Sequence, residues 1–206
     1  MKKEVITKIL GVFLIIFGLL AMIQAISKGE PILIFWICYI GMIIIGIGCL
    51  LNKSYLISSQ LNIITIPLIM WDIDFFSFLI LKKTIFGLAD YFFKEPSIIS
   101  RLISLEHLFL IPLGILAFYL VKDKKDKRQN NKNSLLISIL EVTILFIILK
   151  IINISDKNIN CVFYSCIPYI NPKPYWLWWF VIIFIVVIIT NFIYRYFFYN
   201  KNVPQK

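Results

Sequence analysis

The sequence has a single histidine, His107, and few charged residues, which make up only 16% of its 206 positions. In a soluble domain about a quarter of the residues are charged. Hydrophobic residues account for 60% of the chain and the mean hydropathy is +0.88. These values exclude a soluble globular domain, in which a polar surface surrounds a core of modest size. The length instead fits about five to seven apolar segments of roughly 20 residues joined by short loops.

Cysteine is also scarce, and its four copies are too scattered for a disulfide scaffold. Cys38 and Cys49 fall inside apolar runs, where a cysteine is usually a small core residue. Cys161 and Cys166 lie in a loop that we expect on the oxidising side of the membrane, so a disulfide between them is one of the alternatives that the sequence leaves open.

Six apolar runs predict an all-α fold, a polytopic transmembrane helical bundle in which residues 1–206 form one integral membrane domain. The predicted spans are 6–25, 32–51, 55–80, 102–121, 134–152 and 175–195. We expect the first run to be retained, because no small-x-small cleavage site precedes the next hydrophobic segment. Segment 84–100 mixes aromatic residues with charged residues, glycine and proline, which is typical of an interfacial stretch.

The basic residues gather at the start of the chain, in the loop 122–133 and at the tail. With the N-terminus inside, 13 of the 21 Lys and Arg residues fall on the cytoplasmic side and 8 on the other. The positive-inside rule therefore predicts two cytoplasmic termini and a multi-pass protein of the cell membrane. The basic residues that give the net charge of +10 then set the orientation of the protein and interact with anionic lipid headgroups. We expect membrane lipids as partners, and no nucleic acid.

Polar groups from separate segments converge on the outer face in this topology. An ionisable side chain inside a span is a functional hypothesis by default, and only groups at similar depth can cooperate. Counting 1.5 Å of helix rise per residue from each span end gives these depths. The groups predicted at the outer face are Cys38, Asp72, Asp74, Glu106, His107, Asn158 and Asn160.

His107 has three interpretations. It is an interfacial histidine bonded to a neighbour such as Asp74, a general base that acts on Cys38, or a metal ligand with Asp72, Asp74 or Glu106. A single histidine excludes zinc sites that need two or three, while a hard cation held by carboxylates stays open. We expect no bound metal and no cofactor.

The third span is unusually polar. The side chains that share one of its faces, by spacings of three, four and seven, are Ser58, Asn62, Thr65 and Asp72. They either form hydrogen bonds between helices or line a substrate path. Ser59 lies near the inner end of this span, so a dyad with His107 is excluded, because it would bridge most of a core of about 30 Å.

Glu141 lies inside the fifth span, too deep for the outer cluster. It pairs with Asn62 or Gln60, or it serves a proton path.

Several short motifs between residues 31 and 195 have a familiar arrangement. They are Cys38 at its distance from the turn at Leu51, Asn52 and Lys53, His107 with Pro112 after it, and the segment 158–163 followed by prolines and Tyr175. In these motifs the chain resembles six-helix membrane proteins of the bacterial YwaF-like type. Their eukaryotic relatives include a transmembrane phospholipid acyltransferase and the androgen-induced fatty-ester hydrolases. The resemblance implies acyl transfer or ester hydrolysis on a lipid.

The resulting hypothesis is a lipid-directed acyltransferase or ester hydrolase that opens to the outer leaflet. Cys38 would attack the ester, His107 would take its proton, and Asp74 would orient the imidazole. The residues expected to contact substrate are Gln60, Asn62 and Asn160, the last as an oxyanion donor.

Two rival functions come from other classes. A small-solute transporter would use the polar third span and Glu141 as a passage, and so short a chain would need to form a homodimer to enclose it. No internal repeat of the transporter kind is evident in the sequence. A structural membrane protein would use the same polar residues only to hold its helices together.

Overall fold

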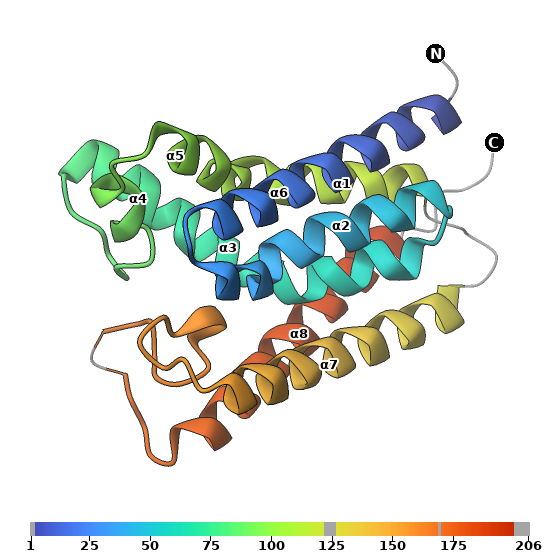
Figure 1. Cartoon of the computed structure of the whole chain (residues 1–206). Coiled ribbons are helices and arrows are strands. Elements are labelled where there is room, and N and C mark those ends of the chain that lie inside the picture. Colours follow the sequence, from blue (N-terminus) through green and yellow to red (C-terminus); the bar gives the residue numbers. More distant parts are fainter. Residues whose placement is uncertain (1–2, 122–126, 169, 200–206) are drawn as a thin grey trace.

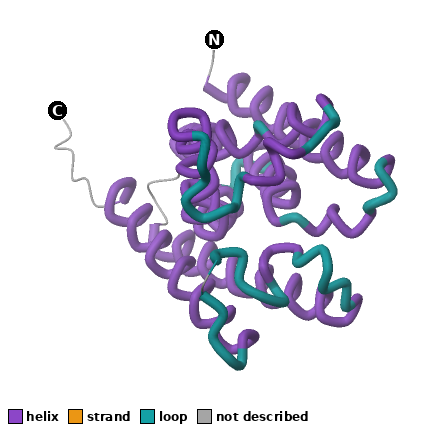
Figure 2. The backbone as a smooth tube through the Cα atoms, turned by 90° about the vertical axis from the view of Figure 1, so that its left-hand side faces the viewer, coloured by secondary structure: helices purple, strands orange, loops and turns teal. Residues whose placement is uncertain are grey.

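A computed structural model describes residues 3–121, 127–168 and 170–199 of the chain. Its helices are α1 Lys3–Ser27, η1 Pro31–Phe35, α2 Ile37–Leu50, α3 Ser54–Leu81, α4 Asp90–Lys94, α5 Ile98–Ser104, α6 Glu106–Val121, α7 Lys127–Ile152, η2 Ile159–Cys161 and α8 Tyr175–Tyr199. Loops join them, and no strand occurs in the described residues (Figure 2). The predicted all-α helical bundle is confirmed.

Five helical stretches are long and apolar enough to cross a membrane. They are α1, α3, the combined α5 and α6 over Ile98–Val121, the Asn130–Ile152 part of α7, and α8 over Tyr175–Phe198. The chain is accordingly a multi-pass membrane protein, since soluble domains carry no set of such helices.

The span predicted over 32–51 is shorter than expected. The chain first forms the 3-10 helix η1, which has Pro31 in its first turn, and Trp36 then interrupts the helix at φ −60° and ψ 125°. The 14 residues of α2 rise about 21 Å, less than the bilayer core of about 30 Å. Hydropathy could not detect this break, because the residues on both sides of Trp36 are equally apolar.

Helix α3 forms the centre of the bundle and packs against α2, α6, α7 and α8, while α1 packs on α2 and α6 (Figure 1). Small residues permit the closest approach, which is between α1 and α2. A Cβ atom added to Gly46 would lie 2.6 Å from the carbonyl oxygen of Gly11. Such backbone proximity is typical of helix pairs in membranes.

Three polar side chains of α3, those of Gln60, Asn62 and Thr65, bond to neighbouring helices. Asn62 donates from Nδ2 to Ser134 and Ser138 of α7, at 3.0 and 3.2 Å. The hydroxyl of Thr65 bonds to that of Tyr194 on α8 at 2.9 Å. For Asn62 and Thr65, the interhelical interpretation of the polar third span is therefore confirmed.

The bundle has two distinct ends (Figure 1). The turn between α2 and α3 lies at one end, together with the starts of α1 and α7 and the end of α8. Helices α4 and α5, the start of α2 and the loop between α7 and α8 lie at the opposite end. Residues 122–126 of the predicted basic loop lie outside the described residues, and which end faces the cytoplasm stays a prediction from charge.

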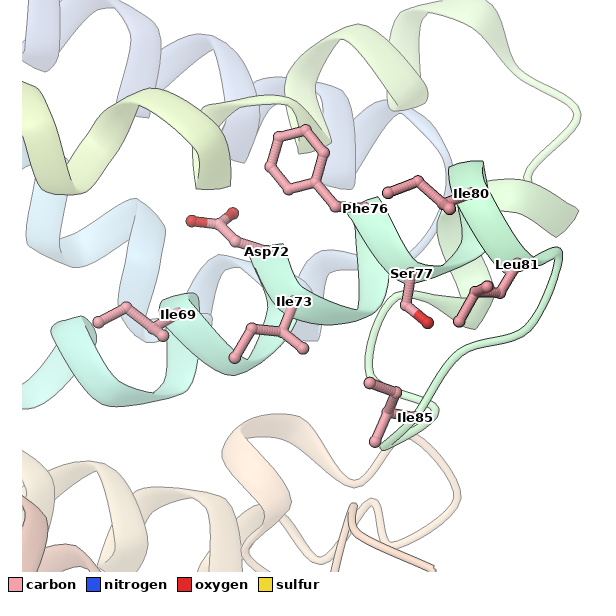
Figure 3. A pocket seen from close by; sticks show the side chains of 8 residues that line it. All are labelled: Ile69, Asp72, Ile73, Phe76, Ser77, Ile80, Leu81 and Ile85. Carbon is pink, nitrogen blue, oxygen red and sulfur yellow. The ribbon is translucent and has the colours of Figure 1, made fainter.

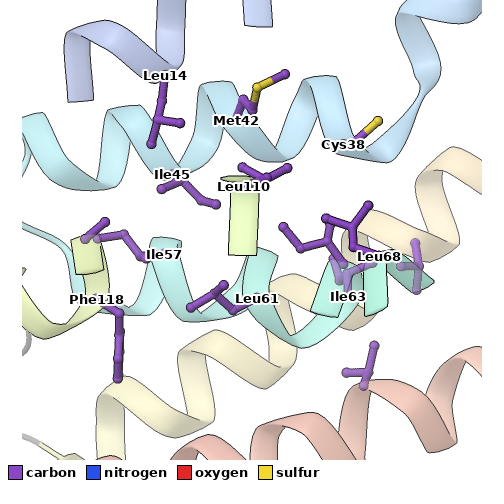
Figure 4. Packing of buried hydrophobic residues seen from close by; sticks show 14 of the residues in the cluster. Leu14, Cys38, Met42, Ile45, Ile57, Leu61, Ile63, Leu68, Leu110 and Phe118 are labelled. Atoms are coloured by element: carbon purple, nitrogen blue, oxygen red, sulfur yellow. The ribbon is translucent and has the colours of Figure 1, made fainter. Parts of the chain in front are cut away.

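The apolar core runs between α1, α2, α3 and α6, where Leu14, Met42, Ile45 and Leu61 are fully buried (Figure 4). Cys38 belongs to the same cluster, near the start of α2. The core thus holds α2 and α6 in register, and this register determines which polar groups meet at the α4 end.

Candidate functional site

Cys38, Glu106 and His107 meet at the α4 end of the bundle. The sulfur, a carboxylate oxygen and a ring nitrogen all lie within 4.8 Å of one another. Cys38 is 4% exposed and Glu106 is fully buried. Among the described residues, no other three Cys, His, Asp or Glu side chains come as close. The structure therefore brings together two of the three predicted catalytic residues, Cys38 and His107.

Asn160 fixes the start of α2, next to Cys38. Its Oδ1 accepts a hydrogen bond from the Ile37 N–H at 3.1 Å, and its Nδ2 donates to the Phe35 carbonyl at 2.8 Å. Trp179 in turn donates from Nε1 to the carbonyl of Asn160 at 3.1 Å. Asn160 thus lies near the cluster as predicted, but both ends of its amide bind backbone groups, so its contacts support a capping role in place of the predicted oxyanion donor.

The ring of His107 is held from two sides. Its Nδ1 lies 2.8 Å from the carbonyl oxygen of Ser104, and the ring stacks on Trp71 with centroids 4.6 Å apart. A carbonyl only accepts hydrogen bonds, so Nδ1 carries the proton and Nε2 keeps a free lone pair. The neutral ring is therefore fixed in the tautomer that a base or a ligand requires.

Glu106 is the member of the cluster that the sequence placed at the outer face and offered as a possible metal ligand, but did not select as a catalytic residue. Its Oε1 lies 3.7 Å from Nδ1 of His107, and its carboxyl group interacts with the Cys38 thiol. Neither carboxyl oxygen accepts a hydrogen bond of ordinary geometry from the described residues. Buried polar groups are normally satisfied, so an exception of this kind requires an explanation, and a role in a functional site provides one. The sequence feature that could have pointed to a catalytic role is its predicted depth in the membrane, which is the same as that of His107.

Asp74 does not join the cluster. Its fully buried carboxylate accepts hydrogen bonds from four backbone N–H groups of the loop that follows α3. The donors are Ile85 and Phe86 at 2.7 Å, Leu88 at 2.5 Å and Ala89 at 3.3 Å. No hydrogen bond or ion pair links Asp74 to His107 in the described structure. Its contacts support a structural role in place of the predicted imidazole orientation.

Gln60 and Asn62, predicted to contact substrate, instead bond to α7. Gln60 donates from Nε2 to Glu141 at 2.5 Å, the pairing that was one of the alternatives for Glu141. Asn62 binds the hydroxyl groups described above. No hydrogen bond joins either amide to Cys38, Glu106 or His107.

A shallow apolar hollow of about 460 Å³ lies along α3, on the face of the helix that carries Ile69, Ile73 and Phe76 (Figure 3). Its lining is aliphatic and aromatic except for Asp72 and Ser77, and it ends at Ile85 on the following loop. Asp72 directly follows Trp71, whose indole supports His107. Most of the lining nevertheless faces away from Trp71 by helical rotation, so the hollow offers a hydrocarbon-binding surface that α3 separates from His107.

Tyr91 of α4 completes the surroundings of the cluster. Its hydroxyl interacts with the Ser104 side chain and lies within electrostatic range of Cys38 and Glu106. Although Tyr91 is 45% exposed as a whole residue, desolvation of its hydroxyl, followed by the proximity of Cys38 and Glu106, raises the pKa of Tyr91 well above its ordinary value. The group therefore stays protonated and can act as a hydrogen-bond donor.

The loop between α7 and α8 is closed by a disulfide between Cys161 and Cys166, whose Cα atoms are 5.5 Å apart. Asn158 also accepts hydrogen bonds from the backbone N–H groups of Phe163 and Tyr164. These contacts stiffen the loop that carries Asn160.

Comparison with known proteins finds no family model, no curated protein and no solved structure that matches this chain. The resemblance to the YwaF-like proteins thus stays a prediction, which rests on Cys38, His107 and the loop motifs. Any functional conclusion depends on the geometry of the cluster itself.

Proposed function

We propose that the protein is a membrane-embedded enzyme that transfers or hydrolyses the acyl groups of lipid esters, with Cys38, Glu106 and His107 as its reacting groups. One observation carries the proposal, namely the convergence of a thiol, an imidazole and a buried carboxyl group within 4.8 Å. A nucleophile, a base and a third polar group in contact form the arrangement of covalent acyl-transfer catalysis.

The proposed reaction has two half-steps. Nε2 of His107 takes the thiol proton, and the Cys38 thiolate attacks the ester carbonyl carbon. The intermediate collapses to a thioester, and the imidazolium returns the proton to the departing alcohol. Water or a second alcohol then attacks the thioester and restores the thiol. Glu106 stabilises the imidazolium, the role predicted for Asp74, and Tyr91 offers a proton to the oxyanion.

Three features support a lipid as the substrate. The cluster lies among helices of membrane-spanning character, so the substrate that meets its surroundings is one dissolved in the bilayer. The apolar hollow on the other face of α3 provides a hydrocarbon-binding surface outside the cluster. The resemblance to six-helix acyltransferases and hydrolases implies the same chemistry. The excess of basic residues predicted at the other end of the bundle favours an outer-leaflet site in the cell membrane.

The test is lipid turnover by the purified protein in nanodiscs that contain a fluorescent ester phospholipid. We expect Cys38→Ala and His107→Gln to abolish release or transfer of the fatty acid. Cys49→Ala is the matched control, because Cys49 is the other buried free cysteine of α2 and belongs to no such cluster. A hydroxylamine-sensitive acyl adduct on Cys38 should be seen by mass spectrometry. Turnover that survives Cys38→Ala would contradict the proposal.

A further inference from the structure

The carboxyl group of Glu106 has a property that its supporting role in acyl transfer does not explain. It is fully buried, and both of its oxygens lack a hydrogen-bond partner of ordinary geometry among the described residues. Asp74, at the same end of the bundle and equally buried, has four such partners. An unpaired buried carboxylate is strongly unfavourable, so such a group either keeps its proton or is compensated by a cation, and the donor atoms around it favour the cation.

The donor atoms beside Glu106 narrow the identity of this cation. Hard ions such as calcium and magnesium take oxygen ligands, whereas thiolate and imidazole ligands select zinc and similar transition metals. One sulfur, one nitrogen and one carboxylate oxygen within 4.8 Å form such a mixed set. The zinc sites excluded by the single histidine were those with two or three histidines, and this set requires one.

Charge balance also favours a divalent ion. A thiolate and a carboxylate together neutralise two positive charges, and a neutral imidazole adds none. A neutral site avoids the desolvation penalty that an isolated ion would suffer among apolar helices. A trivalent or monovalent ion would leave a net charge in the same surroundings.

The surroundings of His107 match those of metal-binding histidines. Such residues usually donate their second ring N–H to a carbonyl or carboxylate, which fixes the tautomer and the ring orientation. Here Nδ1 donates to the carbonyl of Ser104, and Trp71 supports the ring face. Nε2 is left as the nitrogen with a lone pair for a metal, while Nδ1 is the ring atom that lies 3.7 Å from Oε1 of Glu106.

We propose that Cys38, Glu106 and His107 bind a divalent transition-metal ion of the zinc type, and that this ion inhibits the enzyme. Binding releases the thiol proton to solvent as the metal–sulfur bond forms, with no change in oxidation state. The bound ion occupies the lone pairs of the thiolate and of Nε2, so neither can act on an ester. The inhibitory part rests on the proposed function, while the binding part does not.

Cobalt(II) is the probe for the test, because thiolate ligation gives it an intense charge-transfer band that zinc lacks. The full-length protein in detergent micelles is titrated with Co²⁺ without reductant, so that the Cys161–Cys166 disulfide stays intact. We expect the band in the wild type and in Cys49→Ala, and its displacement by Zn²⁺. Cys38→Ser should abolish it, and Glu106→Gln should weaken Co²⁺ binding by about tenfold or more.

A parallel assay follows lipid turnover as Zn²⁺ is added. We expect activity to fall with the same midpoint as the displacement of Co²⁺. A wild-type protein without a thiolate band, or a band that persists in Cys38→Ser, overturns the metal site. If the band forms and turnover is unaffected by Zn²⁺, the inhibition is overturned and binding stands. Turnover that needs Cys38 in a protein that gives no band would leave the proposed function intact and reject only the metal.

Discussion

At the scale of single residues, two buried carboxyl groups at the α4 end of the bundle have opposite surroundings. Asp74 accepts four backbone hydrogen bonds, whereas Glu106 accepts none of ordinary geometry from the described residues. Hydrogen bonds to a carboxylate stabilise its charged form and commit it to structure. Glu106 instead lies beside a thiol and an imidazole, where a reaction or a ligand can use it.

Replacing Asp74 by Asn should therefore destabilise the fold and leave the cluster intact. The amide nitrogen would face backbone donors, and we expect a loss of about 1.5–3 kcal/mol in the free energy of unfolding. Unfolding in mixed detergent micelles measures this loss, with Asp72→Asn on the same helix as the matched control. Equal losses in the two variants would contradict the structural role of Asp74.

At the scale of elements, α3 is a polar helix that is accommodated because other helices surround it. Its two amides and the Thr65 hydroxyl bond to α7 and α8, which removes much of the cost of placing them in a membrane. The same bonds reduce the support for a transporter, since Gln60 and Asn62 are engaged in packing. Their role as substrate contacts loses support for the same reason.

The α1–α2 contact gives an element-scale prediction. Gly46→Ala would place a methyl group 2.6 Å from the Gly11 carbonyl oxygen, so the helices must separate, at a cost of about 1–3 kcal/mol. Gly41→Ala is the matched control on the same helix, where the nearest atom would be Gln60 Oε1 at an ordinary 3.5 Å. Detergent unfolding of both variants checks the difference. A Gly46→Ala protein as stable as Gly41→Ala would mean that the helices are not in such close contact.

The sequence predicted the depth of the site residues in the membrane well, but it did not predict how each helix is rotated about its axis. Helix rise alone placed Cys38, Glu106 and His107 at one end of the bundle, where the structure has them. Which side chain faces which depends on the rotation of each helix about its axis and on how irregular loops return. Asp74 has the same predicted depth as His107, but the rotation of α3 about its axis directs the Asp74 carboxylate to the loop after α3. The break at Trp36 was equally hidden, because Asn160, distant in sequence, caps the helix that follows.

At the scale of the whole molecule, ion pairs join segments around the site end. Lys28, after α1, binds Glu95 at 2.9 Å, and Lys157 binds Glu30 at 2.5 Å. These pairs connect the α1–α2 loop to the α4–α5 region and to the loop that carries Asn160. The surroundings of the cluster are thus assembled from segments distant in sequence.

The first of these pairs should make stability depend on pH. The hydrogen bond from Lys28 lowers the pKa of Glu95 below its ordinary value of 4.5. The stabilisation is therefore fully present above about pH 4.5 and is lost as the pH falls through the lower folded-state pKa. Because both side chains are partly exposed, we expect at most about 1 kcal/mol. Unfolding of the wild type and Lys28→Met from pH 7 to 3 tests this, and a difference that persists at pH 3 would contradict it.

The central claim is that Cys38 is activated by His107 at the outer face of the membrane. The most direct test is the rate at which a small, charged, membrane-impermeant thiol reagent modifies Cys38 on intact cells. In a Cys49→Ala background without reductant, Cys38 is the one free thiol, because Cys161 and Cys166 are joined. We expect modification from outside that slows roughly tenfold or more in His107→Gln. A Cys38 that reacts only after permeabilisation, or equally fast in both proteins, would contradict it.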